Sequence, residues 1–401
     1  MIDLDAALAI IAGVARPLGS ETVALQAAGG RILSAPVVSG LAAPRQDVSA
    51  MDGYAVREQD LQAGGALKVV GASYPGRAFA GVLPAGGCVR IFTGAPVPAG
   101  ADRVVVQEIV ASDGSGIRLL ANPSKARHIR AQGSDFRSGA ALLPAGRALG
   151  FREMVVTAAA DVAMVAVWRR PRVSIVTTGD ELTEPGAAAK TPTLVPDSLL
   201  YGIAAFVAEW GGVVSGAVRC PDDLEKLSAA AFSAAAEADL VVIAGGASVG
   251  ERDFSRTAFA RTGMELLFEK VAIKPGKPVW FGKAGHGLVL GLPGNPTSAL
   301  VTARLFLAPL LAGLAGLDPA AAIAWDSAPL GQELPACAER ETLVRGRRVD
   351  GQVWPVMNQD SGAQLALAET DVLIRRPRRA PAINRGGMAP VLCFQSVLQR
   401  S

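Results

Sequence analysis

Asp239-Leu-Val-Val-Ile-Ala244 runs into Gly245-Gly-Ala-Ser-Val-Gly250, and Leu288-Val-Leu-Gly291 runs into Leu292-Pro-Gly-Asn-Pro-Thr-Ser-Ala299. Each stretch is a short apolar run followed by a glycine-rich turn and the start of a helix. Apolar runs of this kind are typical of strands that are buried on both faces of a parallel sheet. Open parallel sheets bind ligands at the carboxyl ends of their strands. We therefore expect the loops after these strands to converge on a binding site.

The two turns have the composition of a phosphate cradle. Glycine-rich turns that open a helix point backbone N–H groups at an anion, with the positive end of the helix behind them. A Gly-Gly turn after a strand is also often nothing more than a turn. Taken together with the lysine turn described next, the residues that we expect to bind the ligand are Gly245, Gly246, Ser248, Gly250, Lys277, Pro293, Gly294, Asn295, Pro296 and Ser298.

A lysine-rich turn lies between the two stretches, in Glu269-Lys-Val-Ala-Ile-Lys-Pro-Gly-Lys-Pro278. Two prolines stiffen this turn, and Lys270, Lys274 and Lys277 crowd three ammonium groups onto it. The turn alone could be a solvated surface loop. Its place in the βα alternation predicts that it joins the other two loops, and the combination suggests a polyanionic ligand.

The length of 401 residues predicts two to four domains. The βα alternation that begins at residue 169 predicts a doubly wound α/β domain. Short strand-like runs precede it and follow it, and they predict β-rich flanking domains. We expect a discontinuous linker and dimerisation domain (1–40 and 138–168), a small β domain (41–137), the α/β domain (169–316) and a C-terminal β-barrel domain (317–401).

Composition excludes several classes of function. Lys and Arg number 39 against 36 Asp and Glu, so the net charge of +3 gives no case for binding nucleic acid or a membrane surface. The amino terminus lacks the features of a secretory signal, and we expect a cytoplasmic protein. The apolar run 299–317 contains Arg304 and Pro309, and we interpret it as a buried helix. Four scattered cysteines and two histidines make zinc and disulfides poor interpretations.

Carboxylates occupy the loops that follow the expected strands of the α/β domain, at Asp180, Glu181, Asp222 and Asp253. Such loops combine hard oxygen ligands for Mg²⁺ with amide donors for phosphate oxygens. Three turns of the expected small β domain also carry polar side chains, namely Asp52, Thr93 and Asp135. Asp-Gly and Thr-Gly are ordinary turn formers, so each of these turns alone is more simply a turn than a site.

The chain resembles the molybdopterin molybdenumtransferases, a family that includes the carboxyl-terminal domain of gephyrin. Seven motifs in the family's order carry the resemblance: Ser49 to Val56, Phe92 to Asp102 with Glu108, Gly133 to Asp135, Pro171 to Leu182, Gly245 to Asp253, Lys270 to Pro278 and Gly291 to Ala299. The resemblance implies an enzyme that takes adenylylated molybdopterin and molybdate, releases AMP with Mg²⁺ and leaves molybdenum on the pterin dithiolene. It also implies a homodimer whose active site is shared between subunits.

The resemblance also implies roles for individual residues. The expected catalytic residues are Asp52, Thr93, Asp135, Glu181, Asp222, Asp253, Lys270 and Lys274. Glu181 and Asp253 are expected to bind Mg²⁺, and Lys270 and Lys274 to bind phosphate or molybdate. Asp52, Thr93 and Asp135 are expected to enter the site from the partner subunit. No protein nucleophile is required, because positioning and charge neutralisation can carry both steps.

Three other interpretations remain open from the sequence. Gly246-Ala-Ser-Val-Gly250 fits the nucleophile elbow of α/β-hydrolases, which would need His286 as its histidine. A molybdopterin adenylyltransferase shares the α/β domain but does not need the flanking β domains. A gephyrin-like scaffold would bind peptides and perform no chemistry. Retention of the lysines and carboxylates favours an enzyme.

Overall fold

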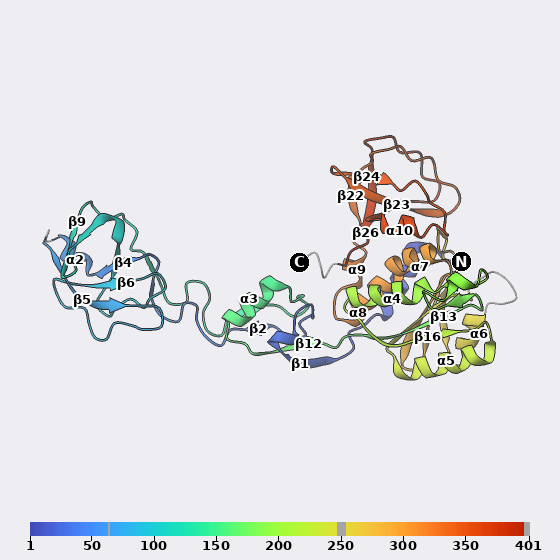
Figure 1. The fold of residues 1–401 in the computed structure, drawn as a ribbon, viewed down its shortest axis with the longest axis horizontal. Helices are drawn as coiled ribbons and strands as arrows, with labels where there is room; N and C mark the ends of the chain where they lie inside the picture. Colours follow the sequence, from blue (N-terminus) through green and yellow to red (C-terminus); the bar gives the residue numbers. More distant parts are fainter. Residues whose placement is uncertain (63–64, 247–253, 397–401) are drawn as a thin grey trace. The chain divides into compact units, whose positions relative to one another are not determined.

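The computed structural model describes residues 1–62, 65–246 and 254–396 (Figure 1). The chain divides into two compact units. The larger unit consists of Met1–Ala35, Ala145–Gly150 and Ala166–Ser401, and the smaller unit consists of Pro36–Pro144 and Phe151–Val165.

A six-stranded mixed sheet forms the centre of the larger unit, in the order β16-β13-β17-β21-β20-β18. Its parallel strands are β13 (Arg172–Thr178), β16 (Val213–Cys220), β17 (Leu240–Ala244) and β21 (Gly287–Leu292). Two further strands, β20 (Trp280–Ala284) and β18 (Glu265–Glu269), extend the sheet in antiparallel fashion. Ala244 is in register with Thr177 on one side and Leu292 on the other, so three parallel strands end level with one another.

Helices cover both faces of this sheet, as the α/β alternation predicts (Figure 1). Alternate residues of β17 explain the arrangement, because side chains along a strand point to opposite faces. Leu240 and Val242 pack in the cluster that includes α1 (Leu4–Val14), α4 (Ser198–Glu209), α7 (Pro296–Thr302) and α8 (Ala308–Leu314). Val241 and Ile243 pack in the cluster that includes α5 (Leu224–Glu237) and α6 (Phe254–Ala260). The predicted doubly wound α/β core is confirmed.

The expected buried helix is also present. Residues Pro296–Leu314 form one helix of 19 residues that is long and apolar enough to cross a membrane, yet 94% of its apolar window is buried inside the protein. A π-helical segment, Ala303–Leu307, interrupts it. The guanidinium of Arg304 in this segment donates to the carbonyl oxygens of Cys393 (2.6 Å) and Ala322 (2.9 Å). The helix is therefore a core element that also bonds the C-terminal region.

A second six-stranded sheet of the larger unit follows the α/β region in sequence. The order is β19-β23-β25-β26-β22, and β24 pairs with β23. These strands are β19 (Ile273–Lys274), β22 (Asp326–Pro329), β23 (Glu341–Val349), β24 (Gln352–Pro355), β25 (Val372–Arg376) and β26 (Met388–Cys393). The remaining helices and strands of this unit are α9 (Pro319–Ala322), α10 (Leu365–Ala368), β14 (Leu182–Thr183), β15 (Val195–Pro196) and β1 (Ser20–Ala24), which pairs with β12 (Met164–Trp168).

The lysine turn begins at the carboxyl end of β18, which points in the same direction as β21 because each of them is antiparallel to β20. The turn therefore starts at the sheet edge that the sequence predicted, but it contains β19, which pairs in parallel with β23 of the C-terminal sheet. A run of basic residues such as 375–379 normally indicates solvated surface, but this one is partly buried, because β25 extends into it and Arg376 is only 1% exposed.

The smaller unit is built on a sheet with the strand order β7-β4-β6-β5-β9-β8. These strands are β4 (Gly53–Val56), β5 (Leu67–Ser73), β6 (Gly87–Ile91), β7 (Arg103–Val106), β8 (Val110–Ser112) and β9 (Gly116–Leu119). Two short strand pairs and two helices complete it: β2 (Val37–Val38) with β11 (Ala141–Leu143), β3 (Val48–Ser49) with β10 (Ile129–Arg130), α2 (Glu58–Gln62) and α3 (Phe151–Ala159).

Candidate active site

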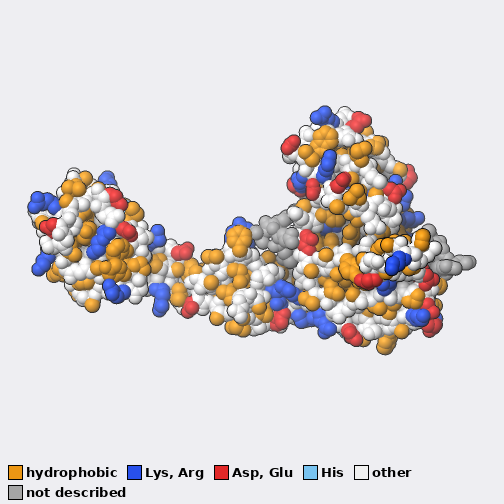
Figure 2. Space-filling model, in the orientation of Figure 1, with side chains coloured by type: hydrophobic (Ala, Val, Ile, Leu, Met, Phe, Trp, Pro, Cys, Tyr) orange, Lys and Arg blue, Asp and Glu red, His pale blue; other side chains and the backbone are white. Residues whose placement is uncertain are grey.

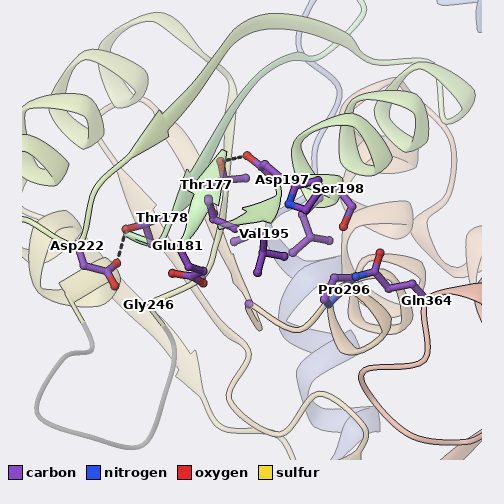
Figure 3. Close-up of a pocket in the computed structure, with 17 residues that line it drawn as sticks. Thr177, Thr178, Glu181, Val195, Asp197, Ser198, Asp222, Gly246, Pro296 and Gln364 are labelled. Atoms are coloured by element: carbon purple, nitrogen blue, oxygen red, sulfur yellow. Dashed lines mark hydrogen bonds between the residues drawn. The ribbon is translucent and has the colours of Figure 1, made fainter. Parts of the chain in front are cut away.

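A cavity of about 680 Å³ lies at the carboxyl ends of the parallel strands (Figure 3). Its walls come from the ends of β13 and β17, the loops after β13, β16 and β21, the start of α4 and the C-terminal loop before α10. The lining residues are Thr177, Thr178, Gly179, Glu181, Leu182, Val195, Pro196, Asp197, Ser198, Leu199, Asp222, Ala244, Gly245, Gly246, Gly294, Pro296 and Gln364. This is the position at which open parallel sheets bind ligands.

Two adjacent threonines at the end of β13 hold two of the carboxylates in this wall. The hydroxyl of Thr177 donates to Asp197 over 2.6 Å, and the hydroxyl of Thr178 donates to Oδ1 of Asp222 over 2.8 Å. Neighbouring side chains on a strand point in opposite directions. The two threonines therefore direct one carboxylate to each side of the strand end, as Figure 3 shows.

The carboxylate of Asp197 is committed to structural bonds. It is 1% exposed, caps α4 by accepting from the amide of Leu200, and accepts from Nε of Arg219 over 3.2 Å. Burial by itself lowers the pKa of Arg219, but its bonds to Glu184 and Asp197 outweigh burial and leave the pKa raised. The guanidinium thus stays charged and neutralises Asp197.

Among the described residues, neither Glu181 nor Asp222 forms an ion pair with a lysine or an arginine. The carboxylate of Glu181 lies directly over Gly179, where a Cβ on the glycine would come within 2.6 Å of Glu181 Oε2. Glycine at 179 therefore leaves room for Glu181 to fold back toward the cavity. The amide of Asp222 donates to Oδ1 of Asp180 over 3.0 Å, which ties together the loops that follow β13 and β16.

The glycine turns bring three loops into contact, as the sequence predicted for two of them. A Cβ on Gly294 would lie 3.2 Å from the Cα of Gly245, and a Cβ on Gly245 would lie 2.3 Å from the carbonyl oxygen of Thr178. Gly245 also has a φ of +102°, which side chains rarely adopt. Only glycine at 245 allows the ends of β13, β17 and β21 to approach this closely.

The charge of the wall is strongly one-sided. Among the lining residues that the structure describes, Glu181, Asp197 and Asp222 are acidic, and none is lysine or arginine. Because Arg219 neutralises Asp197, the uncompensated negative charge of the described wall sits on Glu181 and Asp222. A cation bound by these two carboxylates would favour the entry of an anionic ligand.

The structure brings together some of the predicted site residues and leaves others outside the wall. Those in the wall are Glu181, Asp222, Gly245, Gly246, Gly294 and Pro296. Lys270, Lys274 and Lys277 are exposed and do not line this cavity, and neither do Pro293, Asn295 and Ser298. Lys274 lines a different cavity, formed with residues of the C-terminal sheet. Ser248, Gly250 and Asp253 lie outside the described residues.

Three predicted residues belong to the smaller unit. Oδ1 of Asp52 accepts hydrogen bonds from the amide (2.7 Å) and the hydroxyl (2.8 Å) of Thr93. The amide bond is the main reason that the pKa of Asp52 is lowered, and the hydroxyl bond adds to it. Asp135 is exposed in a turn, and its own amide donates to the carbonyl oxygen of Ala43. The carboxylate of Asp52 is therefore ionised, and Thr93 holds it in one orientation.

Sequence reasoning missed several wall residues. Thr177 and Thr178 lie inside the motif Pro171 to Leu182, but the sequence alone did not predict a role for either threonine. Gln364 comes from the C-terminal region, and no local signal in the sequence connects it to the α/β loops.

The hydrolase interpretation also fails. His286 lies just before β21, which runs parallel to β17, so it sits at the opposite edge of the sheet from the loop after β17.

The α/β core with its cavity at the strand ends, flanked by β-rich regions, is typical of a ligand-binding open-sheet protein. Family models match as follows: the MoeA N-terminal region (domain I and II) at residues 2–160, a probable molybdopterin binding domain at 174–313, and the MoeA C-terminal region (domain IV) at 327–394. The middle match contains most of the cavity wall.

Whole-length relatives make the assignment specific. A molybdopterin molybdenumtransferase of Nostoc is 35% identical over 382 residues, which cover 92% of this chain and 87% of the relative. One from Haemophilus influenzae is 37% identical and covers 75% of this chain and 74% of the relative. The crystal structure of a molybdopterin biosynthesis MoeA protein from Pyrococcus horikoshii has a TM-score of 0.83 and 28% identity, and covers 99% of this chain and 100% of that one. The chain belongs to the molybdopterin molybdenumtransferase family.

Proposed function

We propose that this protein inserts molybdate into adenylylated molybdopterin, with Mg²⁺-dependent release of AMP, in the cavity at the strand ends. The observation that carries the proposal is the acidic wall formed by Glu181 and Asp222 beside the glycine turns at 245 and 294. The names of the relatives support the molybdenumtransferase activity. Mg²⁺, the release of AMP and a cytoplasmic location are parts of the proposal.

The residues of the wall fit a magnesium ion. Mg²⁺ in phosphate-binding sites takes one or two carboxylates and completes its shell with water and substrate phosphate oxygens. In the described part of the chain, no three His, Cys, Asp or Glu side chains are grouped to hold a metal ion by themselves. Glu181 and Asp222 would supply the protein ligands, and Asp253 is the further ligand that the sequence predicts. When bound, the ion would offset phosphate charge and polarise the phosphoanhydride.

The chain itself supplies position and orientation. Thr178 fixes the carboxylate of Asp222, and Gly179 leaves Glu181 free to point at the ligand. At Gly245 and Gly294 the chain presents backbone without side chains to the cavity, as close approach of a phosphate group requires. Catalysis then rests on alignment and charge neutralisation, with no covalent intermediate on the protein.

An assay of the purified full-length protein tests this proposal. With adenylylated molybdopterin and Mg²⁺, we expect AMP to be released only when molybdate is added, and release to stop when EDTA is present. A molybdopterin adenylyltransferase would instead consume ATP in the presence of molybdopterin, and a scaffold would do neither. Either of those results would overturn the proposed activity.

We also propose a homodimer with a shared active site, in which Asp52, Thr93 and Asp135 act on the partner's ligand. Apolar side chains on α3 support a protein interface. Phe151 is 74% exposed and Val155, one turn later, is 68% exposed. Figure 2 shows hydrophobic side chains at the surface over this helix. Isolated apolar residues are common on surfaces, but two on one helical face form a patch that a partner would cover.

The double substitution Phe151→Ser and Val155→Ser should convert the dimer to a monomer, because it removes the apolar contact without touching the cavity. Sedimentation equilibrium at micromolar protein measures the change. Leu120→Ser, which replaces an equally exposed apolar side chain (68%) outside α3, is the matched control and should leave the mass unchanged. A wild-type protein that sediments as a monomer would refute the shared site.

A further inference from the structure

The smaller unit carries a ladder of stacked aromatic and arginine side chains, which runs from Arg77 through Tyr74, Phe92 and Arg90 to Tyr54. The rings of Tyr74 and Phe92 are 5.0 Å apart between centroids and 15° from parallel. The guanidinium of Arg90 lies 4.7 Å from the ring centroid of Phe92 and 5.1 Å from that of Tyr54. The guanidinium of Arg77 lies 4.9 Å from the ring centroid of Tyr74. These distances are in the range of aromatic stacking and cation–π attraction, so the five side chains hold one another in place.

Strand pairing positions the ladder. Tyr54 on β4 is in register with Arg90 on β6, and residues directly opposite one another project from the same face of a sheet. Phe92 and Tyr74 directly follow the last residues of β6 and β5, which are paired with each other. A tight turn then returns the chain to Tyr74, because the amides of Tyr74 and Arg77 each donate to the other's carbonyl oxygen over 2.9 Å.

The two arginines of the ladder differ in what their donors do. Nη1 of Arg90 donates to the carbonyl oxygen of Gly53 over 3.1 Å, and its Nη2 donates to Oε1 of Gln107 over 2.6 Å. The side chain of Arg77 is exposed, and within the described residues it makes neither a hydrogen bond nor an ion pair. Arg90 is therefore committed to the unit itself. Arg77 is held by its stacking partner while its hydrogen-bond donors stay free.

The ladder is continuous with the carboxylate that Thr93 orients. Phe92 directly precedes Thr93, whose amide and hydroxyl donate to Oδ1 of Asp52. The charge of Arg90 adds to these two bonds in lowering the pKa of Asp52. The side chain of Tyr74 is 37% exposed. The surface around the ladder thus offers an aromatic face, a free guanidinium and an ionised hydrogen-bond acceptor.

We propose that Tyr74 and Arg77 bind a planar heterocycle that carries a phosphate group, with the ring stacked on the ladder and the phosphate on the donors of Arg77. Aromatic side chains bind heterocyclic bases through their faces, and a guanidinium forms short, charge-assisted hydrogen bonds to phosphate. The ring is adenine or a pterin, and adenylylated molybdopterin contains both. A role for the ladder in holding that substrate rests on the proposed function, whereas the binding itself does not.

Modification of Arg77 by p-hydroxyphenylglyoxal tests the binding, because a guanidinium that holds a phosphate group reacts slowly. The rate is measured in the full-length protein by peptide mass spectrometry, without molybdate. AMP and neopterin monophosphate are the probes, and ribose 5-phosphate, which lacks the ring, is the control. We expect AMP, neopterin monophosphate or both to slow Arg77 at least threefold at a concentration at which ribose 5-phosphate has no effect. The probe that acts at the lower concentration identifies the ring. Arg118, an exposed arginine of the same unit, should react at an unchanged rate.

Two substitutions of Tyr74 then assign the effect to the aromatic face. Tyr74→Leu should raise the probe concentration for half-protection of Arg77 roughly tenfold, the loss expected for one stacking contact. Tyr74→Phe keeps the ring and should be protected like the wild type. Because the side chain is partly exposed, neither change should prevent folding, which circular dichroism checks.

Three results would overturn the proposal: no protection of Arg77 by either ring-bearing probe, equal protection by ribose 5-phosphate, or a Tyr74→Leu variant that is protected like the wild type. A ladder that only stabilises the smaller unit would give the first of these results. Protection is measured without transfer of molybdenum or release of AMP. A failure of the proposed transferase activity would therefore leave this result standing, and a failure of binding at the ladder would leave the transferase assay unaffected.

Discussion

Asp222→Asn lowers the rate of molybdate-dependent AMP release by roughly a hundredfold to a thousandfold, the range found when one preorganised electrostatic group is removed. The substitution keeps the shape of the side chain and its hydrogen bond from Thr178, and removes one of the two uncompensated charges in the wall. The loss should appear in kcat measured at saturating substrate. Because the charge is the cause, excess Mg²⁺ should restore only part of the rate.

Asp223→Asn is the matched control, since Asp223 is the next residue but caps α5 by accepting from the amide of Lys226. Asparagine caps a helix as well as aspartate does, so both stability and rate should stay near wild type. Thr178→Val should have an intermediate effect, because it frees the carboxylate of Asp222 but keeps its charge. An Asp222→Asn enzyme that works at the wild-type rate would exclude Asp222 from the mechanism.

Gly245→Ala destabilises the larger unit by roughly 2–4 kcal/mol, because it adds a steric clash to backbone strain. The new Cβ would lie 2.3 Å from the carbonyl oxygen of Thr178, which is backbone and has little freedom to move, and the φ of +102° is unfavourable for alanine. The clash would displace Thr178, which orients the carboxylate of Asp222. Activity should therefore fall even in the molecules that remain folded. Thermal unfolding and the rate of AMP release at 20 °C measure the two effects.

Gly263→Ala separates strain from the clash. Gly263 has a φ of +77°, and a Cβ there would have no atom within 4 Å. This variant should lose only about 1–2 kcal/mol and keep full activity. If Gly245→Ala were no worse than Gly263→Ala, the close approach of the three strand ends would not matter for the site.

Local sequence patterns predicted the elements whose own residues determine them. An aspartate immediately before an amphipathic run is a helix-start signal, and Asp3 does cap α1 by accepting from the amide of Ala6. The β-branched run 239–244 became β17, buried on both faces. The antiparallel strand β20, which joins β18 to the rest of the sheet, was not predicted, because an apolar run does not encode the direction in which it pairs. The pairing of Lys274 with Thr342, 68 positions away, has no local signal either.

The part of the candidate site that lies directly after strands was predictable from the sequence. Glu181, Asp222 and the glycines follow directly after strands, and the topology of the sheet gathers them. Asp197 and Arg219 form a pair that only the folded structure reveals, and the position of Lys274 depends on pairing with a distant strand. The burial of Arg376 was missed because a basic run normally indicates solvent, whereas its place in β25 depends on pairing with β23.

The membership of β19 in the C-terminal sheet has a consequence for how the larger unit can be divided. Segment 271–278 sits between β18 and β20 of the α/β sheet, but its own strand partner comes from β23. A protease that cut near residue 317 would leave two fragments interlocked by main-chain hydrogen bonds. Neither fragment would be an autonomous folding module, and the nicked protein should elute as one particle until a denaturant separates its parts.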